Sequence, residues 1–413
     1  MTDVDVYIDW ECGLRQVGQI HRLAARGREA VLFTYADTWL DADDAFAIAP
    51  DLPLGRGTFA PPNGQDMFGT IGDSAPDTWG RRLMQRRERR QAKDENRQAR
   101  TLQEMDYLLG VNDDTRLGAF RFRYPGDDVF QAPDDLGVPG IVKLGDLMHA
   151  AQRIENGEET DEDLQLIFAP GSSLGGARPK ASVYDQHNVL SIAKFPKDTD
   201  DYSMERWETI ALDIGEAAGL NVVRCDLNMS SGHPVFVTQR FDRNGERRIP
   251  FLSAMALTQN RDGERGSYLD VVDALTEHGA QPETDRIELY RRITLSVLIR
   301  NVDDHLRNHG FLRDGGKGWK LSPAYDINPT PSYLKAPILA TDIIDGQADC
   351  SIDLLHEAAE WFSISLDDAK DIIRSVADVT RTWRDFANKR GAPKREIDIM
   401  ESAFEHETLE HAF

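Results

Sequence analysis

Cysteine is scarce in this sequence, and long apolar segments are absent. The three cysteines, Cys12, Cys225 and Cys350, lie far apart, which fits neither a disulfide framework nor a zinc knuckle. No run approaches the roughly 18 consecutive apolar residues of a membrane-spanning helix. The first residues, MTDVDVYIDWECG, lack the basic region and apolar stretch of a secretory signal. Together these features predict a cytoplasmic protein.

Positive charge is also in short supply, because 48 Lys and Arg face 71 Asp and Glu, a formal net charge of −23. This excess argues against a protein that coats nucleic acid over its whole surface. One basic island lies at residues 81–93, RRLMQRRERRQAK. We interpret it as a solvent-facing helix side rather than as a docking patch for DNA or an acidic partner. The length of 413 residues and 40% hydrophobic content indicate a globular protein of two or three packed units.

The N-terminal hundred residues predict a small, mostly β unit. Val4, Val6 and Ile8 alternate with other residues, as in a half-buried strand. The unit ends in a helix whose first turn we expect Asp73 or Ser74 to cap.

Helices and strands then mix along the chain. Apolar residues at helical spacing predict helices at 101–110, 144–154, 203–218, 286–300, 353–362 and 365–388. Alternation predicts strands at 117–123, 189–196 and 235–238.

A small-residue loop lies at 168–185, FAPGSSLGGARPKASVYD. Its glycines and serines precede a predicted strand: Gly171, Ser172, Ser173, Gly175 and Gly176. Such loops let backbone N–H groups approach phosphate oxygens without obstruction by side chains. The pattern is neither the Walker G-x-x-x-x-G-K-[ST] nor the kinase G-x-G-x-x-G, so a flexible hairpin is the alternative interpretation.

Lys194 stands in the next apolar run, VLSIAKFP, where desolvating an ammonium is unfavourable without a partner. A kinase would give this lysine the α- and β-phosphates of a nucleotide and a carboxylate from the following helix. Glu208 is our first choice for that carboxylate and Glu205 the second; for both, the alternative is a solvent-facing charge. The segment 238–245, TQRFDRNG, then leaves the sheet where the adenine edge of a nucleotide would meet the backbone.

The most informative stretch is 301–326, NVDDHLRNHGFLRDGGKGWKLSPAYD. Asp303 and Asn308 are five residues apart, and Asp326 follows after 18 more. A base Asp, a metal-binding Asn and a second metal-binding Asp beyond a hairpin form the layout of phosphoryl transfer in kinases. One carboxylate orients the substrate hydroxyl, while an amide oxygen and a second carboxylate hold Mg²⁺, which takes oxygen ligands. The alternative is a polar loop whose Asp and Asn residues serve turns and helix caps.

Taken in order, these pieces resemble the HipA family, the serine/threonine kinase toxins of bacterial toxin–antitoxin systems. The resemblance covers nearly the whole chain and lies in seven segments: GDSAPDTWGRRL near Gly72, LGAFRFR near Leu117, SSLGGARPKA at Ser172, IAKFP at Ile192, QRFDR at Gln239, NVDDHLRNHGF at Asn301 and SPAYDI at Ser322. The combination of SLGGARPK with D-x-H-x-x-N…YD is specific to that family, because ordinary kinases have neither in this form.

The resemblance implies an α+β, bilobal protein-kinase-like fold with an additional N-terminal β-rich subdomain and a mainly helical C-lobe. Residues 1–105 would form the N-terminal subdomain. Residues 106–240 would form the kinase N-lobe with the glycine/serine loop and the ATP lysine. Residues 241–413 would form the C-lobe with the catalytic and metal-binding loops.

The resemblance also implies roles for individual residues. Asp303 would be the catalytic base, Asn308 and Asp326 would bind Mg²⁺, and His305 would line the catalytic site. ATP would be bound by Leu174, Gly175, Gly176, Ala177, Lys194, Gln239, Arg240, Phe241, His305, Asn308, Tyr325 and Asp326, of which residues 239–241 would form the adenine hinge. Ser173 would be autophosphorylated, with Ser172 as the second choice, and this modification would switch the enzyme off.

The partners implied are a small helix-turn-helix antitoxin of the HipB type, DNA only through that antitoxin, and a protein substrate, which for the best-known family member is an aminoacyl-tRNA synthetase. Arg178 and Pro179 stand where the best-known type has a glutamine and an acid, so the resemblance does not name the target. Two alternatives stay open: a small-molecule kinase on the same fold, and a catalytically silent partner or co-repressor. The presence of both Asp303 and Asp326 favours an enzyme.

Overall fold

In the computed structural model, the described residues are 2–11, 13–25, 28–132, 137–168, 176–261 and 263–413. They form two compact units. The first unit comprises Met1–Asp198 and Gln239–Leu252, and the second comprises Thr199–Thr238 and Ser253–Phe413. Among the helices described, none combines the length and the apolar character needed to cross a membrane.

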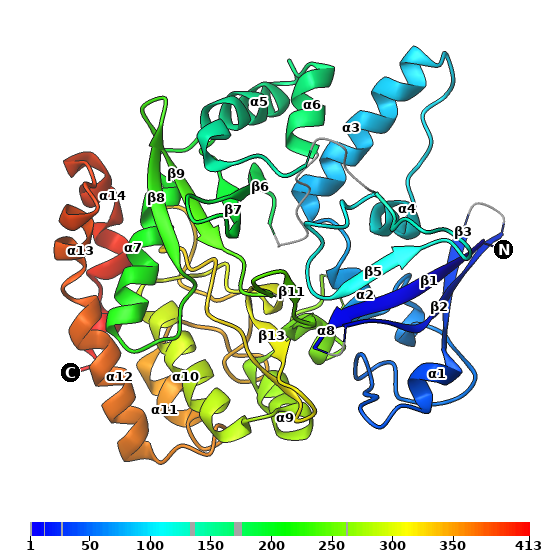
Figure 1. Ribbon diagram of the computed structural model, residues 1–413. Helices are drawn as coiled ribbons and strands as arrows, with labels where there is room; N and C mark the ends of the chain where they lie inside the picture. The colour runs from blue at the N-terminus through cyan, green and yellow to red at the C-terminus, as the bar shows by residue number, and fades with distance from the viewer. Residues whose placement is uncertain (1, 12, 26–27, 133–136, 169–175, 262) are drawn as a thin grey trace. The chain divides into compact units, whose positions relative to one another are not determined.

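A five-stranded antiparallel sheet is the core of the N-terminal part of the first unit (Figure 1). Its order is β4-β3-β2-β1-β5, with bounds β1 Thr2–Trp10, β2 Gly13–Ala25, β3 Arg28–Tyr35, β4 Thr58–Phe59 and β5 Phe120–Arg123. Val4, Val6 and Ile8 are buried, which confirms the alternation predicted for β1. Phe122 of β5 lies opposite Val6, so a segment more than a hundred residues away completes this sheet.

Helices and two hairpins make up the rest of the first unit: α1 Asp37–Leu40, α2 Gly69–Asp73, α3 Thr78–Asp94, α4 Glu104–Leu109, α5 Leu144–Asn156, α6 Asp161–Phe168, β6 Lys180–Tyr184 with β7 Leu190–Lys194, and β10 Arg243–Asn244 with β11 Arg247–Arg248. The predicted cap of α3 at Asp73 or Ser74 is wrong, because these residues end α2. Asp77 caps α3 instead, and its carboxylate accepts a hydrogen bond from the Gly80 N–H at 2.8 Å.

The basic island lies on α3, and several of its arginines form ion pairs within the first unit. The pairs are Arg81–Glu104 at 2.6 Å, Arg82–Glu155 at 3.3 Å, Arg86–Glu159 at 2.7 Å and Arg90–Asp161 at 2.6 Å. These carboxylates come from α4, from α5, from the connection between α5 and α6, and from the first residue of α6. Much of the positive charge on α3 is therefore neutralised by neighbouring helices.

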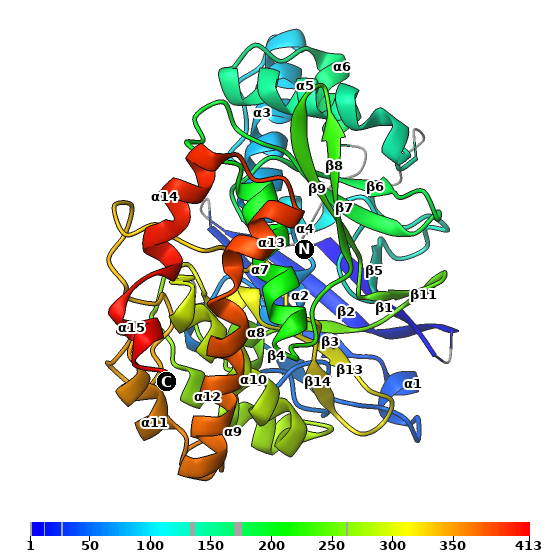
Figure 2. The same ribbon diagram turned by 90° about the vertical axis from the view of Figure 1, so that its left-hand side faces the viewer.

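The second unit is mainly helical. Its elements are α7 Met204–Ala217, β8 Cys225–Ser230, β9 His233–Gln239, α8 Ala254–Leu257, α9 Tyr268–His278, α10 Pro282–Leu298, β13 Gly310–Arg313, β14 Trp319–Leu321, α11 Ile352–Ala358, α12 Leu366–Thr380, α13 Trp383–Lys389, α14 Lys394–Phe404 and α15 Glu407–Glu410. In strand β12, Phe251–Ser253, the first two residues belong to the first unit and the last belongs to the second. Figure 2 shows α12 and α13 beside α7.

Two helix predictions for the second unit have clear outcomes. Helix α7 begins after Ser203, whose hydroxyl accepts a hydrogen bond from the Arg206 N–H at 3.1 Å, as the predicted start at residue 203 requires. The single helix predicted at 365–388 is instead two, because the chain turns at Arg381 and Thr382 between α12 and α13. Trp383 of α13 stacks on Phe404 of α14, with ring centroids 4.7 Å apart, and this packing accounts for the change of direction.

Candidate active site

The predicted catalytic loop follows α10 in the second unit and contains two adjacent aspartates in opposite environments. The side chain of Asp303 is 70% exposed, whereas Asp304 is buried. Lys335 Nζ lies 3.0 Å from Asp303 Oδ1, but an ion pair this exposed contributes only about 0–1 kcal/mol. The Asp303 carboxylate is therefore accessible, which its predicted role as a base requires.

Asp304 holds the loop in place through buried hydrogen bonds. Its Oδ2 accepts hydrogen bonds from the Tyr268 hydroxyl at 2.6 Å and the Ser296 hydroxyl at 2.9 Å. His309 Nε2 lies 3.0 Å from its Oδ1. Burial alone would raise the pKa of Asp304, but the contacts with His309, Tyr268 and Ser296 outweigh burial and hold that pKa below its usual value. Asp304 is therefore a buried anion with three donors around it.

Two hydrogen bonds tie the loop to the segment that contains Asp326. Asn301 Oδ1 accepts from the Asn328 N–H at 3.1 Å, and the Tyr325 hydroxyl donates to the Arg307 carbonyl at 2.8 Å. These ties lie on either side of Asp326 in the chain. These contacts hold the segment that contains Asp326 against the predicted catalytic loop, whereas the role of Asp326 stays a prediction.

Asn308 and Asp326 present the atoms that Mg²⁺ prefers. The Asn308 amide nitrogen donates to the Asp303 carbonyl at 3.3 Å, so the acceptor that the side chain retains is its oxygen. Asp326 has a left-handed backbone, with φ of 57°, a conformation that Asp tolerates better than most residues. One amide oxygen and one carboxylate fit a Mg²⁺ ion that takes its other ligands from phosphates and water.

His305 lies at the start of the short 3₁₀ helix Leu306–Asn308. Its Nδ1 is buried and has no hydrogen-bond partner among the described residues. Its role in the site stays a prediction, as do the roles of Tyr325 and the other residues named for ATP.

The predicted lysine and its carboxylate partner lie in different units. Lys194 is half-buried at the end of β7, in the first unit, and Glu208 lies on α7 in the second. Glu205 and Glu208 are both buried, which contradicts the alternative of solvent-facing charges. That Glu208, or else Glu205, is the carboxylate partner of Lys194 stays a prediction.

The predicted adenine hinge, residues 239–241, is fixed by a buried ionic cluster of the first unit. Arg240 Nη1 donates to the Thr115 carbonyl at 2.9 Å, and its Nε donates to Asp242 Oδ1 at 2.6 Å. Asp242 also accepts from the Gly118 N–H at 2.7 Å. The Arg240 guanidinium is thus engaged, and its main-chain N–H donates to the Leu190 carbonyl at 3.0 Å. The predicted contact of residues 239–241 with adenine stays a prediction.

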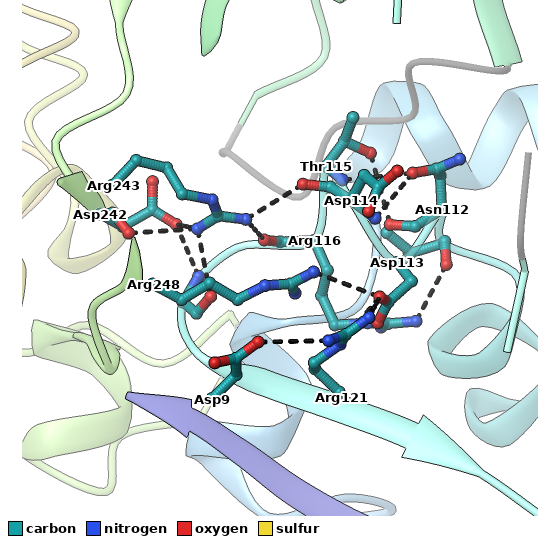
Figure 3. Close-up of polar contacts among 12 residues, drawn as sticks. Asp9, Asn112, Asp113, Asp114, Thr115, Arg116, Arg121, Asp242, Arg243 and Arg248 are labelled. Carbon is teal, nitrogen blue, oxygen red and sulfur yellow. Dashed lines mark hydrogen bonds and ion pairs between the residues drawn. The ribbon is translucent and has the colours of Figure 1, made fainter. Parts of the chain in front are cut away.

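Figure 3 shows the rest of this cluster around Asp242 and Asp113. Arg243 Nη1 lies 2.6 Å from Asp242 Oδ2, and Asp113 Oδ2 accepts from Arg121 at 2.5 Å and Arg248 at 3.2 Å. Burial alone would raise the pKa of Asp242, but Arg240 and Arg243 lower it to about 2. The cluster ties residues 239–248 to residues 113–121.

The predicted phosphate loop is described only from Gly176 onward. Ser172, Ser173, Leu174 and Gly175 lie outside the described residues, so the autophosphorylation prediction has no structural outcome here. Gly176 has a φ of 113°, a backbone conformation that favours glycine.

Sequence reasoning missed the residues that hold the loop in place. Asp304, Asn301, Tyr268 and Ser296 make its buried contacts, and Lys335 pairs with Asp303. One available signal was the doubled aspartate at 303–304, of which one is exposed and one is buried. The identity of the buried one depends on Tyr268 and Ser296, which are distant in the chain.

Comparison with known proteins identifies the family and the fold. The family model described as HipA-like C-terminal domain matches residues 172–383, and the model described as HipA N-terminal domain matches residues 8–109. A HipA chain from the Shewanella oneidensis MR-1 complex of HipA, HipB and operator DNA has the same fold, with a TM-score of 0.69 at 16% identity over 99% of this chain and 96% of that one. This match confirms the predicted α+β fold.

Two curated relatives are named as kinases. "Putative kinase Y4mE" of Sinorhizobium fredii is 26% identical over 223 residues, 49% of this chain and 50% of that protein. A "Putative kinase" of Haemophilus influenzae is 29% identical over 122 residues, 26% of this chain and 36% of that protein. The chain thus spans about half or less of the length of the curated relatives it matches.

Proposed function

Because the chain belongs to the HipA family, we propose that it is an ATP-dependent serine/threonine protein kinase and the toxin of a toxin–antitoxin module. One observation carries the proposal. The exposed Asp303 lies on a loop that the buried Asp304 holds in place. Hydrogen bonds from residues on either side of Asp326 in sequence join its segment to the same loop. This geometry supports phosphoryl transfer, in which catalysis consists mainly of positioning and charge stabilisation.

In the proposed reaction, the hydroxyl oxygen of an acceptor serine or threonine forms a bond to the γ-phosphorus, and the bond from that phosphorus to the bridging oxygen of ADP breaks. Asp303 orients the hydroxyl and accepts its proton. Asn308 and Asp326 would hold Mg²⁺, which supplies positive charge to the phosphates. Lys194 would contact the phosphates, and the main chain of residues 239–241 would contact adenine.

Partners belong to the same proposal. The solved Shewanella structure is a complex with HipB and operator DNA, and it supports an antitoxin of the helix-turn-helix type as the partner of this chain. The net charge of −23 means that the antitoxin would supply most contacts with DNA. The protein substrate, for which an aminoacyl-tRNA synthetase is one candidate, and autophosphorylation at Ser173 or Ser172 are to be identified by experiment.

The test is phosphate transfer from labelled ATP by the purified chain with Mg²⁺, in the presence of lysate proteins. Asp303→Asn should lower the rate at least about 100-fold, because general base catalysis contributes about 10²–10⁴-fold. Asp314→Asn is a matched control, because Asp314 is a partly exposed aspartate of the same unit that, like Asp303, pairs with a lysine: Lys320 Nζ lies 3.2 Å from its Oδ1. Its rate should equal that of the wild type.

Mass spectrometry would locate the phosphate on protein acceptors and on the chain itself. Consumption of ATP with label on a metabolite only would instead indicate a small-molecule kinase. No transfer by the wild-type chain, or full activity of Asp303→Asn, would refute the proposal.

A further inference from the structure

Lys180 and Asp77 form a buried ion pair in the first unit. Lys180 Nζ lies 2.7 Å from Asp77 Oδ2, and each side chain is only 2% exposed. Lys180 begins β6, whereas Asp77 is the cap of α3, 103 residues away in the chain. The pair therefore joins the N-terminal region to the end of the predicted phosphate loop.

Trp79, in the same first turn of α3, adds two hydrogen bonds to this junction. Its indole Nε1 donates to the Lys180 carbonyl at 3.1 Å, and its backbone N–H donates to the Gly176 carbonyl at 3.3 Å. The first turn of α3 thus contacts both ends of the segment from Gly176 to Lys180. Gly176 and Ala177 in this segment are among the residues predicted to contact ATP.

The contact between Lys180 and Gly176 is close. A Cβ atom added to Gly176 would lie 3.0 Å from Lys180 Nζ, which is tighter than ordinary van der Waals contact. The Lys180 ammonium therefore lies close to the Gly176 backbone, which is predicted to contact the nucleotide, so a shift of Lys180 would change the space open to that backbone.

Asp77 also affects Lys194. Lys180 and Lys194 are direct partners across β6 and β7. Like charges at directly opposite positions of neighbouring strands destabilise the sheet. Asp77 supplies negative charge beside Lys180, so it reduces the repulsion that would otherwise displace Lys194, the predicted phosphate ligand.

Stability alone does not explain a fully buried ion pair. Desolvation of the two charges offsets most of their attraction, and well-packed apolar residues in the same place are often equally stable. A buried pair that is retained instead favours one arrangement of the two segments that it joins. We infer that Asp77 is a positioning residue for the nucleotide site, and that Mg·ATP affinity depends on the first turn of α3. This inference rests on the proposed kinase function.

Affinity for Mg·ATP can be measured by calorimetry on the full chain in an Asp303→Asn background, which prevents turnover. Asp77→Asn should bind Mg·ATP about 10- to 100-fold more weakly, since the apparent affinity falls in proportion to the fraction of molecules that keep the binding-competent arrangement. Trp79→Phe removes the indole donor and keeps the apolar ring, and should weaken binding by several-fold, a smaller effect than that of Asp77→Asn.

Glu396→Gln is the control for a general loss of stability. It removes the charge of a largely buried ion pair of the second unit, in which Glu396 Oε1 lies 3.0 Å from Arg206 Nη1. All variants are compared well below their unfolding temperatures, which are measured in parallel. The control should bind Mg·ATP like the parent even though it unfolds at a lower temperature.

Three outcomes separate the possibilities. Normal affinity in both Asp77→Asn and Trp79→Phe would overturn the inference and leave the kinase proposal intact. If Asp77→Asn fails to fold, normal affinity of Trp79→Phe alone overturns it. If the wild-type chain and the Asp303→Asn parent both fail to bind Mg·ATP, the proposed function and this inference fail together.

Discussion

Replacement of Asp304 should damage the fold, whereas replacement of its neighbour Asp303 should damage only the chemistry. The structure predicts this contrast because Asp304 is buried among the Tyr268 hydroxyl, the Ser296 hydroxyl and His309, whereas Asp303 is mostly exposed. The two substitutions Asp303→Asn and Asp304→Asn make the same chemical change at adjacent positions.

The expected magnitudes differ several-fold. Removal of one partner from a buried, hydrogen-bonded charge cluster costs about 3–5 kcal/mol, because the remaining donors stay buried without an acceptor. Asp304→Ala should therefore lower the free energy of unfolding by about 3–5 kcal/mol. Asp304→Asn retains one acceptor oxygen and should lose about 2 kcal/mol. Asp303→Asn is a surface change and should stay within about 0.5 kcal/mol of the wild type.

The pH dependence has a definite sign. The folded-state pKa of Asp304 lies below its usual value, so the unfolded chain binds the proton more tightly. The stability that Asp304 contributes is fully present above the unfolded pKa of about 3.9 and is lost as the pH falls through the folded value. The wild-type chain should therefore lose more stability on acidification from pH 6 to pH 3 than Asp304→Asn does.

Urea unfolding, followed by circular dichroism at pH 7 and at acid pH, measures these differences, and phosphate transfer is measured on the same samples. The reasoning is refuted if Asp304→Asn unfolds at the same urea concentration as the wild type, or if Asp303→Asn loses as much stability as Asp304→Asn.

Three more predictions follow from other contacts. Asp326→Asn should weaken Mg·ATP binding by about 10-fold or more, whereas Asp303→Asn should affect it much less, as calorimetry with and without Mg²⁺ will show. Asn301→Ala removes the acceptor of the hydrogen bond from the Asn328 N–H. It should lower the free energy of unfolding, measured with urea, by about 1–3 kcal/mol and also reduce phosphate transfer. Asp242→Asn should lower the free energy of unfolding by about 3–5 kcal/mol at neutral pH. This difference from the wild type should shrink only as the pH falls below about 4 toward the folded pKa of Asp242, about 2.

Local pattern predicted most of the elements that build the fold. The predicted helix at 203–218 is α7, and the one at 286–300 lies within α10 and the residues after it, because long apolar stripes leave few alternative structures. The prediction placed the start of α3 too early, because it took Pro76 as part of the first turn and sought the capping residue before this proline. The capping residue is instead Asp77, which follows Pro76. The choice between these caps depends on Lys180, which is distant in sequence and binds the Asp77 carboxylate.

Sequence patterns propose the candidate site as a set of residue types, but they do not predict the environment of each residue. The spacing of Asp303, Asn308 and Asp326 follows from the chemistry of metal-assisted phosphoryl transfer, so it is visible in the sequence. The burial of Asp304 arises from Tyr268 and Ser296, which are 36 and 8 residues away and come from α9 and α10. No local pattern in the sequence specifies that Tyr268 reaches the loop.

The same local arrangement occurs in both units. In each of three places, a residue predicted to contact substrate or nucleotide lies beside a buried charge for which no such contact is predicted: Asp303 beside Asp304, Gly176 beside the Lys180–Asp77 pair, and Phe241 beside Asp242. A reacting group must stay accessible, so it cannot contribute much burial to hold its own position. The neighbouring buried charge supplies that position, since an unpaired charge in the interior costs several kcal/mol and strongly disfavours other arrangements. Substitution of these buried charges should therefore reduce activity through geometry, and the effect should differ from that of catalytic substitutions by an accompanying loss of stability.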